Sequence, residues 1–353
     1  MPIDVAFLAE MARVAARGKR SSASVAAFLL DPFPQLEALA RELNDRTYHP
    51  GSARAFVIQE PKRRLIAALP FRDRVVQHAL IARSLPALER WFAPQSYACR
   101  TGKGTHRALR RATDLHRQFP WVLRLDLARF FPSIDHALLL QIILPRTPPD
   151  LRWLARRIVA AGGPCEPVVH YFPGDDLLTP HQRPHGLPIG NLTSQVWANA
   201  MLTPVDHLLA SLLGLGTFVR YCDDLLVYAA DRERLQDAWE RVESRCSELR
   251  LRLHPRKCRL HRTTEPVAFL GFVLQRRETA VRVQLKTQNV RRFRSRMRLA
   301  LREVAAGREE THRVVAAVRA WLAHARHGHT GRLCRAELER VTIVGGPVPV
   351  DAD

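Results

Sequence analysis

Three carboxylates stand in patterns that could hold metal ions. Asp223 and Asp224 are adjacent within residues 217–229, where two short apolar runs flank them and predict a β-hairpin with the acidic pair at its tip. Upstream, an apolar run that begins at Val122 predicts a strand ending in Asp126. Phosphoryl transfer to a growing nucleic-acid end needs two divalent metals close together, and clustered carboxylates can hold both. An acidic pair in a turn more often belongs to a solvated loop, so the hairpin alone does not show that these acids bind metal.

The net charge points to a polyanionic partner. The chain has 353 residues, with 55 Lys and Arg against 34 Asp and Glu, and a formal charge of +21. So large an excess repels itself unless a polyanion is bound, which makes nucleic acid the natural partner. A generally basic protein from an arginine-rich genome is the alternative. Apolar residues make up 46% of the chain, enough for a sizeable core, and the length suits two or three subdomains.

Other classes of protein fit the sequence less well. The six cysteines form no Cys-x-x-Cys pair, so the sequence suggests neither a disulfide framework nor a zinc site. Asp4 and Glu10 interrupt the apolar N-terminus and argue against a signal peptide. The longest strongly apolar run, residues 208–219, is too short to cross a bilayer. We therefore expect a cytoplasmic protein with reduced thiols and no membrane contact.

The elements around the acids predict an α+β fold. Beside the acid-bearing strands, periodicity predicts a helix that Ser133 caps (133–140), an apolar helix that Pro204 kinks or breaks (193–209), an amphipathic helix (235–249) and further strands (251–253 and 267–274). A strand, a helix and two more strands, with acids on neighbouring central strands, form a split β-α-β arrangement.

The whole chain divides into three parts by composition. They are 1–120 (helices, and a basic β-hairpin at 53–69 that precedes a helix at 71–88), 121–284 (the acid-bearing strands, with a Pro-, Gly- and His-rich insertion or long loop at about 145–185) and 285–353 (helical and strongly basic, with a C-terminal tail).

The same motifs, in this order, make the chain resemble the reverse transcriptases. The shared residues are Asp126 with Phe130-Phe131, residues 186–195, Tyr221-Cys222-Asp223-Asp224, Lys257 and Phe269-Leu270-Gly271-Phe272. The prokaryotic branch, which includes group II intron enzymes and retrons, is the most similar, and its fingers motifs match Lys62, Arg64, Ile66 and residues 97–106. The resemblance covers residues 55–340 or so. It implies a right-hand polymerase whose fingers, palm and thumb correspond in order to the three parts above.

Within that branch, the chain looks most like the enzymes of diversity-generating retroelements. Most other reverse transcriptases have Gln-Gly where this chain has Ile189-Gly190, and group II enzymes tend to have Ser-Pro where it has Ser194-Gln195. Residues 174–180 and 321–330 also look like that subfamily. Such enzymes copy a template-repeat RNA, misincorporate opposite adenine and work with a small basic accessory protein.

The implied activity is that of an RNA-directed DNA polymerase. Its partners would be a template RNA, a DNA or RNA primer and dNTPs. Another stand-alone prokaryotic reverse transcriptase, serving an orphan intron or phage defence, is the alternative. A catalytically idle RNA-binding scaffold is a rival of a different class, and the intact acids argue against it.

The resemblance assigns the metals to the three acids. Asp126 and Asp223 would ligate both of two Mg²⁺ ions, for which Mn²⁺ could substitute, and Asp224 would be a weaker or transient ligand. One ion would lower the pKa of the primer 3′-hydroxyl, and the other would neutralise the triphosphate and the departing pyrophosphate. Lys257 could protonate that pyrophosphate or simply contact a phosphate.

Other residues are implied in nucleotide binding. Phe131, five residues after Asp126, would exclude a ribose 2′-hydroxyl and so select dNTPs; the alternative is a core position, which we expect for one of Phe130 and Phe131. Lys62 and Arg64 lie on one face of a predicted strand, suited to the β- and γ-phosphates, or they form a solvated basic hairpin. The resemblance completes the set with Ile189, Gly190 and Gln195.

A last group is implied in binding primer and template. Arg63 would contact the template, and Tyr221 would lie beside the primer. Gly271 lets a backbone approach closely, as expected where a hairpin with Leu270 grips the primer end. A helix after residue 286 is apolar on one side and basic on the other, as a thumb along a duplex backbone would be, or it presents a solvated face; its proposed contacts are Arg291, Arg294 and Arg298. The set His324, His327, His329 and Cys334 matches no zinc template.

Overall fold

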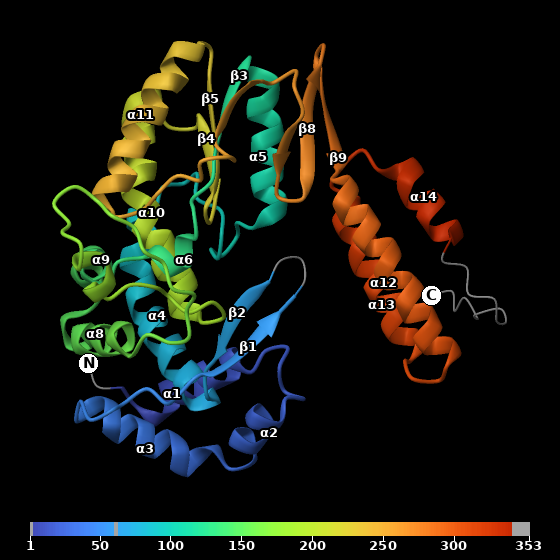
Figure 1. The fold of residues 1–353 in the computed structure, drawn as a ribbon. Coiled ribbons are helices and arrows are strands. Elements are labelled where there is room, and N and C mark those ends of the chain that lie inside the picture. The colour runs from blue at the N-terminus through green and yellow to red at the C-terminus, as the bar shows by residue number, and fades with distance from the viewer. Residues whose placement is uncertain (1–2, 60–62, 341–353) are drawn as a thin grey trace.

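The computed structural model describes residues 3–59 and 63–340, which form a mixed α+β protein (Figure 1). The helices are α1 (Val5–Ala15), α2 (Ala23–Leu30), α3 (Pro32–Asn44), α4 (Phe71–Trp91), α5 (Thr105–Gln118), α6 (Phe130–Ser133), α7 (His136–Ile143), η1 (Leu144–Arg146), η2 (Pro149–Leu151), α8 (Arg152–Ala161), α9 (Thr179–Gln182), α10 (Leu192–Leu213), α11 (Arg232–Glu248), α12 (Thr287–Ala305), α13 (Thr311–Ala325) and α14 (Gly331–Arg340). The strands are β1 (Arg54–Ile58), β2 (Arg64–Ala68), β3 (Trp121–Leu125), β4 (Phe218–Tyr221), β5 (Asp224–Ala229), β6 (Arg259–Arg262), β7 (Val267–Phe269), β8 (Phe272–Arg277) and β9 (Ala280–Leu285).

The central sheet has the strand order β4-β5-β3-β6, and all of its neighbours are antiparallel. Successive side chains of a strand face opposite sides of a sheet. In β3, Leu123 and Leu125 pack in one core with α10 and α11, whereas Val122 packs in a second core with α5. Helices therefore cover both faces (Figure 1). Because both faces are buried, packing fixes the register of β3 and β5, and with it the place of the acids at their ends.

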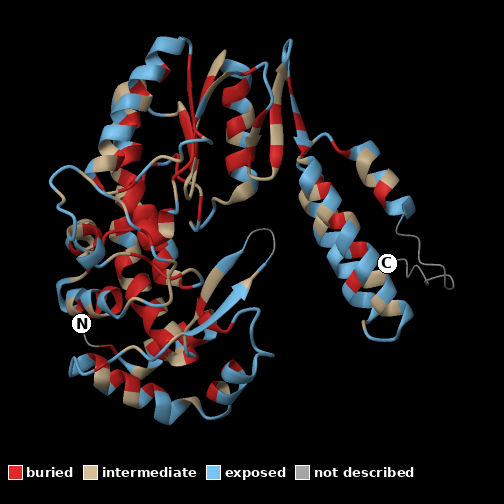
Figure 2. Cartoon of the chain, viewed as in Figure 1, coloured by how far each residue is buried: buried red, intermediate tan, exposed pale blue. Residues whose placement is uncertain are grey.

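The N-terminal part packs around α4. This helix buries Val75, Val76, Ala79 and Leu80, and it contacts α1 and α10. The β1–β2 hairpin projects from this part, and most of its residues are exposed or half-buried (Figure 2). The helices and the hairpin predicted before residue 92 are thus present.

The segment 145–185, predicted as an insertion or long loop, is partly helical. It contains α8, which buries Leu154, Ala155, Ile158 and Val159, and the short α9. Arg183 ties the segment to the rest of the chain, because it forms ion pairs with Asp175 and, at 3.5 Å, with Asp135.

The predicted boundaries around the acids need four corrections. Ser133 does not cap a helix: it ends α6, and the Asp135 carboxylate caps α7 by accepting a hydrogen bond from Leu138 N at 3.0 Å. Residues 251–253 make only an isolated bridge between Leu253 and Leu127. Residues 267–274 are two strands rather than one, because Leu270-Gly271 turns the chain between β7 and β8. Helix α10 continues through Pro204 without a break.

The C-terminal part consists of the β7-β8-β9 sheet and three helices. Helix α12 buries Val290, Phe293 and Met297, and the rings of Phe293 and Trp321 stack at 3.9 Å. The remaining positions of α12 and α13 are mostly exposed (Figure 2), which leaves a long basic surface on one side of a small core. The division of the chain at 120/121 and 284/285 stays a prediction.

Candidate active site

The three acids lie at the ends of neighbouring strands. Leu125, the last residue of β3, pairs with Leu225, so Asp126 follows β3 where Asp224 begins β5. Asp223 lies in the turn between β4 and β5, where Cys222 adopts φ 53°. The Asp126 side chain is largely buried, and its backbone oxygen accepts a hydrogen bond from His254 N at 2.7 Å. The sheet therefore brings together the acids that the sequence singled out.

The electrostatics of the acids reflect their closeness. Burial, followed by the charge of Asp224, raises the pKa of Asp223 to about 6 from its ordinary value of 3.8, and Asp126 adds to the rise. Burial also raises the pKa of Asp224, although Arg124, 3.5 Å away, opposes this. The Lys257 ammonium lies 2.7 Å from Asp126 Oδ1. Carboxylates that disfavour one another's charge are stabilised by a cation between them.

The donor set fits a hard divalent cation. Carboxylate oxygens are the ligands that Mg²⁺ prefers in proteins. With Lys257 against Asp126, the described residues include no group of three or more Asp, Glu, His or Cys side chains already placed around a metal position. Lys257 contacts Oδ1 of Asp126, and a carboxylate has a second oxygen with which it can ligate a metal. The assignment of Asp126, Asp223 and Asp224 as ligands stays a prediction.

A buried ion pair that the sequence did not predict supports the turn. Arg220 and Asp206 are fully buried, and the guanidinium bonds the carboxylate at 2.7 and 2.6 Å. Arg220 also donates to Asn199 Oδ1 at 3.2 Å and to Cys222 O at 3.1 Å. The available signal was an Asp inside an apolar helix and an Arg inside an apolar strand, since such charges are rarely buried without a partner.

The two phenylalanines after Asp126 differ in environment. Phe130 is buried in the core, whereas Phe131 is half-buried at its edge, with the rings 5.5 Å apart at 69°. The backbone oxygen of Phe131 accepts a hydrogen bond from Leu187 N at 2.9 Å, which places Phe131 beside the loop before α10. Of these two residues, Phe131 has the solvent-accessible surface that a nucleotide could contact.

The loop before α10 is joined to the β1–β2 hairpin. Ile189 O accepts a hydrogen bond from Ala67 N at 2.9 Å. Gly190 has φ 118°, and a Cβ there would lie 3.1 Å from Ala67 O and 3.2 Å from Ile66 Cγ2. Only glycine tolerates both that backbone and that closeness. Ile189 is half-buried, and Gly190 and Gln195 are exposed.

Of the three basic residues of the hairpin, the structure describes Arg63 and Arg64. Arg64 begins β2, opposite Ile58, and is exposed; Arg63 is exposed just before it. Lys62 lies outside the described residues, so its predicted place on the same face as Arg64 stays a prediction.

Of the residues expected near the primer, Tyr221 lies beside the acids, and Leu270 and Gly271 lie in the turn between β7 and β8. Tyr221 pairs with Asp224, and its hydroxyl accepts a hydrogen bond from Thr105 Oγ1 at 3.2 Å. Leu270 and Gly271 form a tight turn with φ 46° and 87°. A Cβ at Gly271 would lie 2.8 Å from Asn289 Nδ2, which donates to Gly271 O at 3.0 Å. The left-handed backbone favours glycine there, and a larger residue would also displace the Asn289 side chain at the start of α12.

The three thumb arginines do not behave alike. Arg291 and Arg298 are exposed on α12. Arg294 instead forms a bidentate ion pair with Glu337 of α14 at 2.6 and 2.9 Å, and Glu337 is only 2% exposed. Arg294 therefore holds α14 against α12, which makes it a weaker candidate for a phosphate contact than its two neighbours.

Within the described residues, His324, His327, His329 and Cys334 do not form a group of three or more side chains placed around a metal position. His329 Nδ1 instead accepts a hydrogen bond from Val283 N at 2.9 Å, while the His327 ring stacks on that of His106 at 3.4 Å.

The sequence of this chain matches a known family of proteins. A family described as "Reverse transcriptase (RNA-dependent DNA polymerase)" matches residues 58–274, a span that includes all three acids. The chain belongs to the reverse transcriptase family. Its fold is accordingly the right-hand polymerase fold, with the β4-β5-β3-β6 sheet as the palm. The thumb helices lie beyond the matched span.

One relative of this reverse transcriptase is Protein YkfC of Escherichia coli (strain K12). The two are 28% identical over 184 residues, which cover 50% of this chain and 45% of YkfC. The match thus spans less than half the length of that relative. No helix in the described part of the chain has the length and apolarity needed to cross a membrane.

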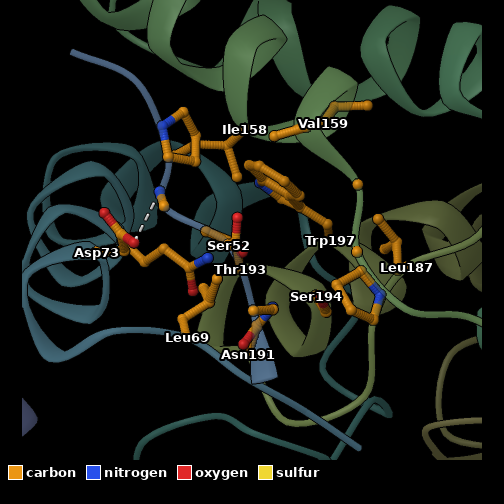
Figure 3. Close-up of a pocket in the computed structure, with 18 of the residues that line it drawn as sticks. Ser52, Leu69, Asp73, Ile158, Val159, Leu187, Asn191, Thr193, Ser194 and Trp197 are labelled. Carbon is orange, nitrogen blue, oxygen red and sulfur yellow. Dashed lines mark hydrogen bonds between the residues drawn. The ribbon is translucent and has the colours of Figure 1, made fainter. Parts of the chain in front are cut away.

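A cavity of about 180 Å³ lies behind the loop before α10 (Figure 3). Leu187 and Asn191 line one side, and Ile158 of α8 lines another. Asp73 also lines it and accepts a hydrogen bond from Gly51 N at 3.0 Å. None of the three acids lines this cavity, but residues of the 186–195 segment do.

Proposed function

We propose that this chain is an active RNA-directed DNA polymerase, which extends a DNA or RNA primer with dNTPs on an RNA template. The observation that carries the proposal is the convergence of Asp126, Asp223 and Asp224 at adjacent strand ends, with the pKa of Asp223 raised to about 6. An idle scaffold has no use for neighbouring carboxylates whose ionised forms are disfavoured by burial and by one another's charge.

The acids would bind the metals on which the reaction depends. Asp126 and Asp223, with Asp224 as a weaker ligand, would hold two Mg²⁺ ions, or Mn²⁺ in their place, and the bound ions would activate the primer 3′-hydroxyl and neutralise the triphosphate. Lys257, now 2.7 Å from Asp126, would turn to the pyrophosphate and either donate a proton or contact a phosphate. Arg124 would favour the ionised form of Asp224, because its positive charge lies 3.5 Å from that carboxylate.

The surrounding residues would bind the nucleotide and the duplex. Phe131, half-buried beside the Leu187 backbone, would exclude a 2′-hydroxyl. The hairpin that carries Lys62, Arg63 and Arg64 would cover the triphosphate and the template. Further contacts would come from Gly190 and Gln195 to the nucleotide, Tyr221, Leu270 and Gly271 to the primer, and Arg291 and Arg298 to the duplex backbone.

We further propose that the enzyme serves a diversity-generating retroelement. The supporting observation is Ile189, which replaces the hydrogen-bonding Gln of most reverse transcriptases in a loop that touches both Phe131 and β2. A small basic accessory protein would be its partner, and misincorporation opposite template adenine would be its product.

Primer extension on an RNA template tests the activity directly. Purified chain with dNTPs and Mg²⁺ should extend a primer, and Asp223→Asn should abolish extension while RNA binding stays largely intact, because the acid makes few contacts to the template. Residual activity within about tenfold of wild type, ~1.4 kcal/mol of barrier, would argue against the metal assignment. Asp114→Asn, a change of the same kind at an exposed position of α5, is the matched control.

A further inference from the structure

The cavity behind the loop before α10 has polar side chains that the proposed mechanism leaves unused. Gln77 of α4 lines it and is only 4% exposed, and its side-chain oxygen has no hydrogen-bond partner among the described residues. The hydroxyl residues Thr193 and Ser194, at the start of α10, line it too and are buried. Native proteins rarely leave a buried acceptor without a donor, so the Gln77 oxygen is suited to a donor that the chain does not supply.

The other walls of the cavity suit a small planar ring. The buried side chain of Trp197 and the apolar Ile158 of α8 line it (Figure 3), together with the buried ring of Tyr48. The volume is about 180 Å³. An engineered cavity of about 150 Å³ holds benzene, whereas pockets for drug-sized ligands measure about 300 Å³ or more. The cavity therefore has room for one heterocyclic base and not for a whole nucleotide.

The charges in the cavity disfavour a phosphate inside it. Among the described residues that line it, none is Lys or Arg, and Asp73 is the one charged side chain. The Asp73 carboxylate accepts hydrogen bonds from the Tyr48 hydroxyl at 2.7 Å and from Gly51 N at 3.0 Å, so each of its oxygens already has a donor. The groups left to a ligand are neutral amides and hydroxyls, which favour a neutral ligand.

The Gln77 amide matches the edge of a nucleobase. An amide offers an acceptor and a donor side by side, and Gln and Asn pair in this way with N6 and N7 of adenine in nucleic-acid recognition. Asn191 supplies a second amide, because it lines the cavity, is buried and does not cap α10 with its side chain. Gly51 and Ser52 line the cavity and are exposed, so it opens to solvent there.

We propose that this cavity is a binding site for one nucleobase, with adenine the best match. The exocyclic amine of the base donates to the Gln77 oxygen, the ring packs against Trp197, and the sugar stays outside, beyond Gly51 and Ser52. The base belongs either to a free nucleoside or to an unpaired nucleotide of the template, and in the second case the inference rests on the proposed polymerase function. Leu187 lines the cavity and its backbone nitrogen donates to Phe131 O at 2.9 Å, so one loop joins this cavity to the proposed sugar gate.

Binding is tested with the full chain and two nucleosides, without catalysis. In titrations followed by saturation-transfer NMR, adenosine should bind at least about tenfold more tightly than purine riboside, which lacks the exocyclic amine and leaves the buried Gln77 oxygen unpaired. Gln77→Leu should lose this preference. Ile158→Phe, which fills the cavity from α8, should weaken the binding of adenosine. Gln236→Leu, a change of the same kind at an exposed position of α11, is the matched control and should bind as wild type does.

Primer extension distinguishes the two sources of the base. The template carries an abasic nucleotide directly ahead of the position being copied, and the rate is compared with that on the intact template. If the base comes from the template, the abasic nucleotide should slow wild type and should lose this effect in Gln77→Leu. Equal slowing of both chains, with adenosine binding as expected above, assigns the site to a free nucleoside.

Three results would overturn the inference. They are the absence of adenosine binding, equal affinity of wild type for the two nucleosides, and a preference for adenosine that survives in Gln77→Leu or in Ile158→Phe, since the Gln77 oxygen would then hold no more than water. A chain that extends no primer would contradict the proposed function instead, while nucleoside binding would still report on the cavity.

Discussion

The Arg220 guanidinium and the Asp206 carboxylate form a bidentate ion pair inside the core, with neither side chain exposed by more than 1%. Asp206 belongs to α10 and Arg220 to β4, so the pair ties the helix after the nucleotide-side loop to the strand before the catalytic turn. Arg220 also holds Cys222 O. Desolvation makes such a pair a poor stabiliser by itself. We infer that its value is in orienting the turn that carries Asp223.

Variants of this ion pair should show that its effect on stability differs from its effect on activity. We expect Asp206→Asn to lower the free energy of unfolding by about 3–5 kcal/mol, because it leaves a buried guanidinium without a counter-charge. The double variant Asp206→Leu/Arg220→Met removes both charges and should regain most of that stability in urea unfolding. It should still extend primers at least tenfold more slowly, since Cys222 O loses its donor. Recovery of the full rate by the double variant would contradict the positioning role.

The raised pKa of Asp223 predicts how activity depends on pH. The folded-state pKa is about 6 against an ordinary value of 3.8, so the carboxylate is lost as the pH falls through about 6. Because the ionised form is proposed to bind Mg²⁺, primer extension at limiting Mg²⁺ should decline below that pH. Higher Mg²⁺ should shift the midpoint downward, since metal and proton compete for the same oxygens. A midpoint that ignores Mg²⁺ would count against the assignment.

The contribution of Asp223 to stability should change with pH in the opposite direction to its contribution to activity. Between pH 3.8 and about 6 the folded chain binds more protons at Asp223 than the unfolded chain does, so this group lowers stability as the pH rises through that window. Asp223→Asn should remove this dependence and leave the variant at least as stable as wild type at neutral pH. The same measurement therefore shows that the inactive variant is folded.

The sequence predicts those features of the site that depend on local patterns, and it misses those that depend on contacts between distant segments. The strand ends and the acids on them were predictable, because an apolar run and the turn residues that end it are neighbours in the sequence. Burial of both faces of the sheet then fixes the register of the strands. The Arg220–Asp206 pair and the Arg294–Glu337 pair were not, because each joins elements that only tertiary packing brings together. The helix cap at Asp135 rather than Ser133 shows the usual error in boundaries: both residues can cap, and the short α6 decides between them.

Phe131 should govern the choice of sugar. Replacement with Ala or Val reduces the ring that is proposed to fill the space of a 2′-hydroxyl, so rNTP incorporation should rise more than dNTP use falls. Single-nucleotide extension with matched dNTP and rNTP measures the ratio. Phe130→Leu is the control, because Phe130 is buried and should affect stability rather than selectivity. Unchanged discrimination in both Phe131 variants would place the gate elsewhere.

The thumb should bind the duplex through its exposed arginines. Replacing Arg291 and Arg298 with Gln should weaken binding to a primer–template of any sequence. It should flatten the log–log salt dependence by roughly one unit for each phosphate that the variant no longer neutralises. Arg294→Gln should instead lower the melting temperature with little change of slope, because Arg294 pairs with Glu337.

Two surface arginines of α11, Arg241 (exposed) and Arg245 (half-buried), provide the control for the thumb. Arg241 and Arg245, replaced together with Gln, remove the same charge from another helix. A slope that changes equally in this pair and in the α12 pair would show a general charge effect and no contact by α12.

Fidelity should depend on Ile189. Its backbone oxygen is fixed by Ala67 N, so the side chain is held beside the proposed nucleotide site but offers volume without a hydrogen bond. A misaligned base pair then forfeits less stabilisation, and a discriminating contact of ~1.4 kcal/mol corresponds to tenfold in selectivity. We expect Ile189→Gln to lower misincorporation opposite template adenine more than opposite other bases. Ile189→Val keeps the apolar character and should preserve the wild-type spectrum. Sequencing of cDNA from an adenine-rich template compares the three enzymes, and identical error spectra in all of them would remove Ile189 from the mechanism and weaken the retroelement proposal, though not the polymerase one.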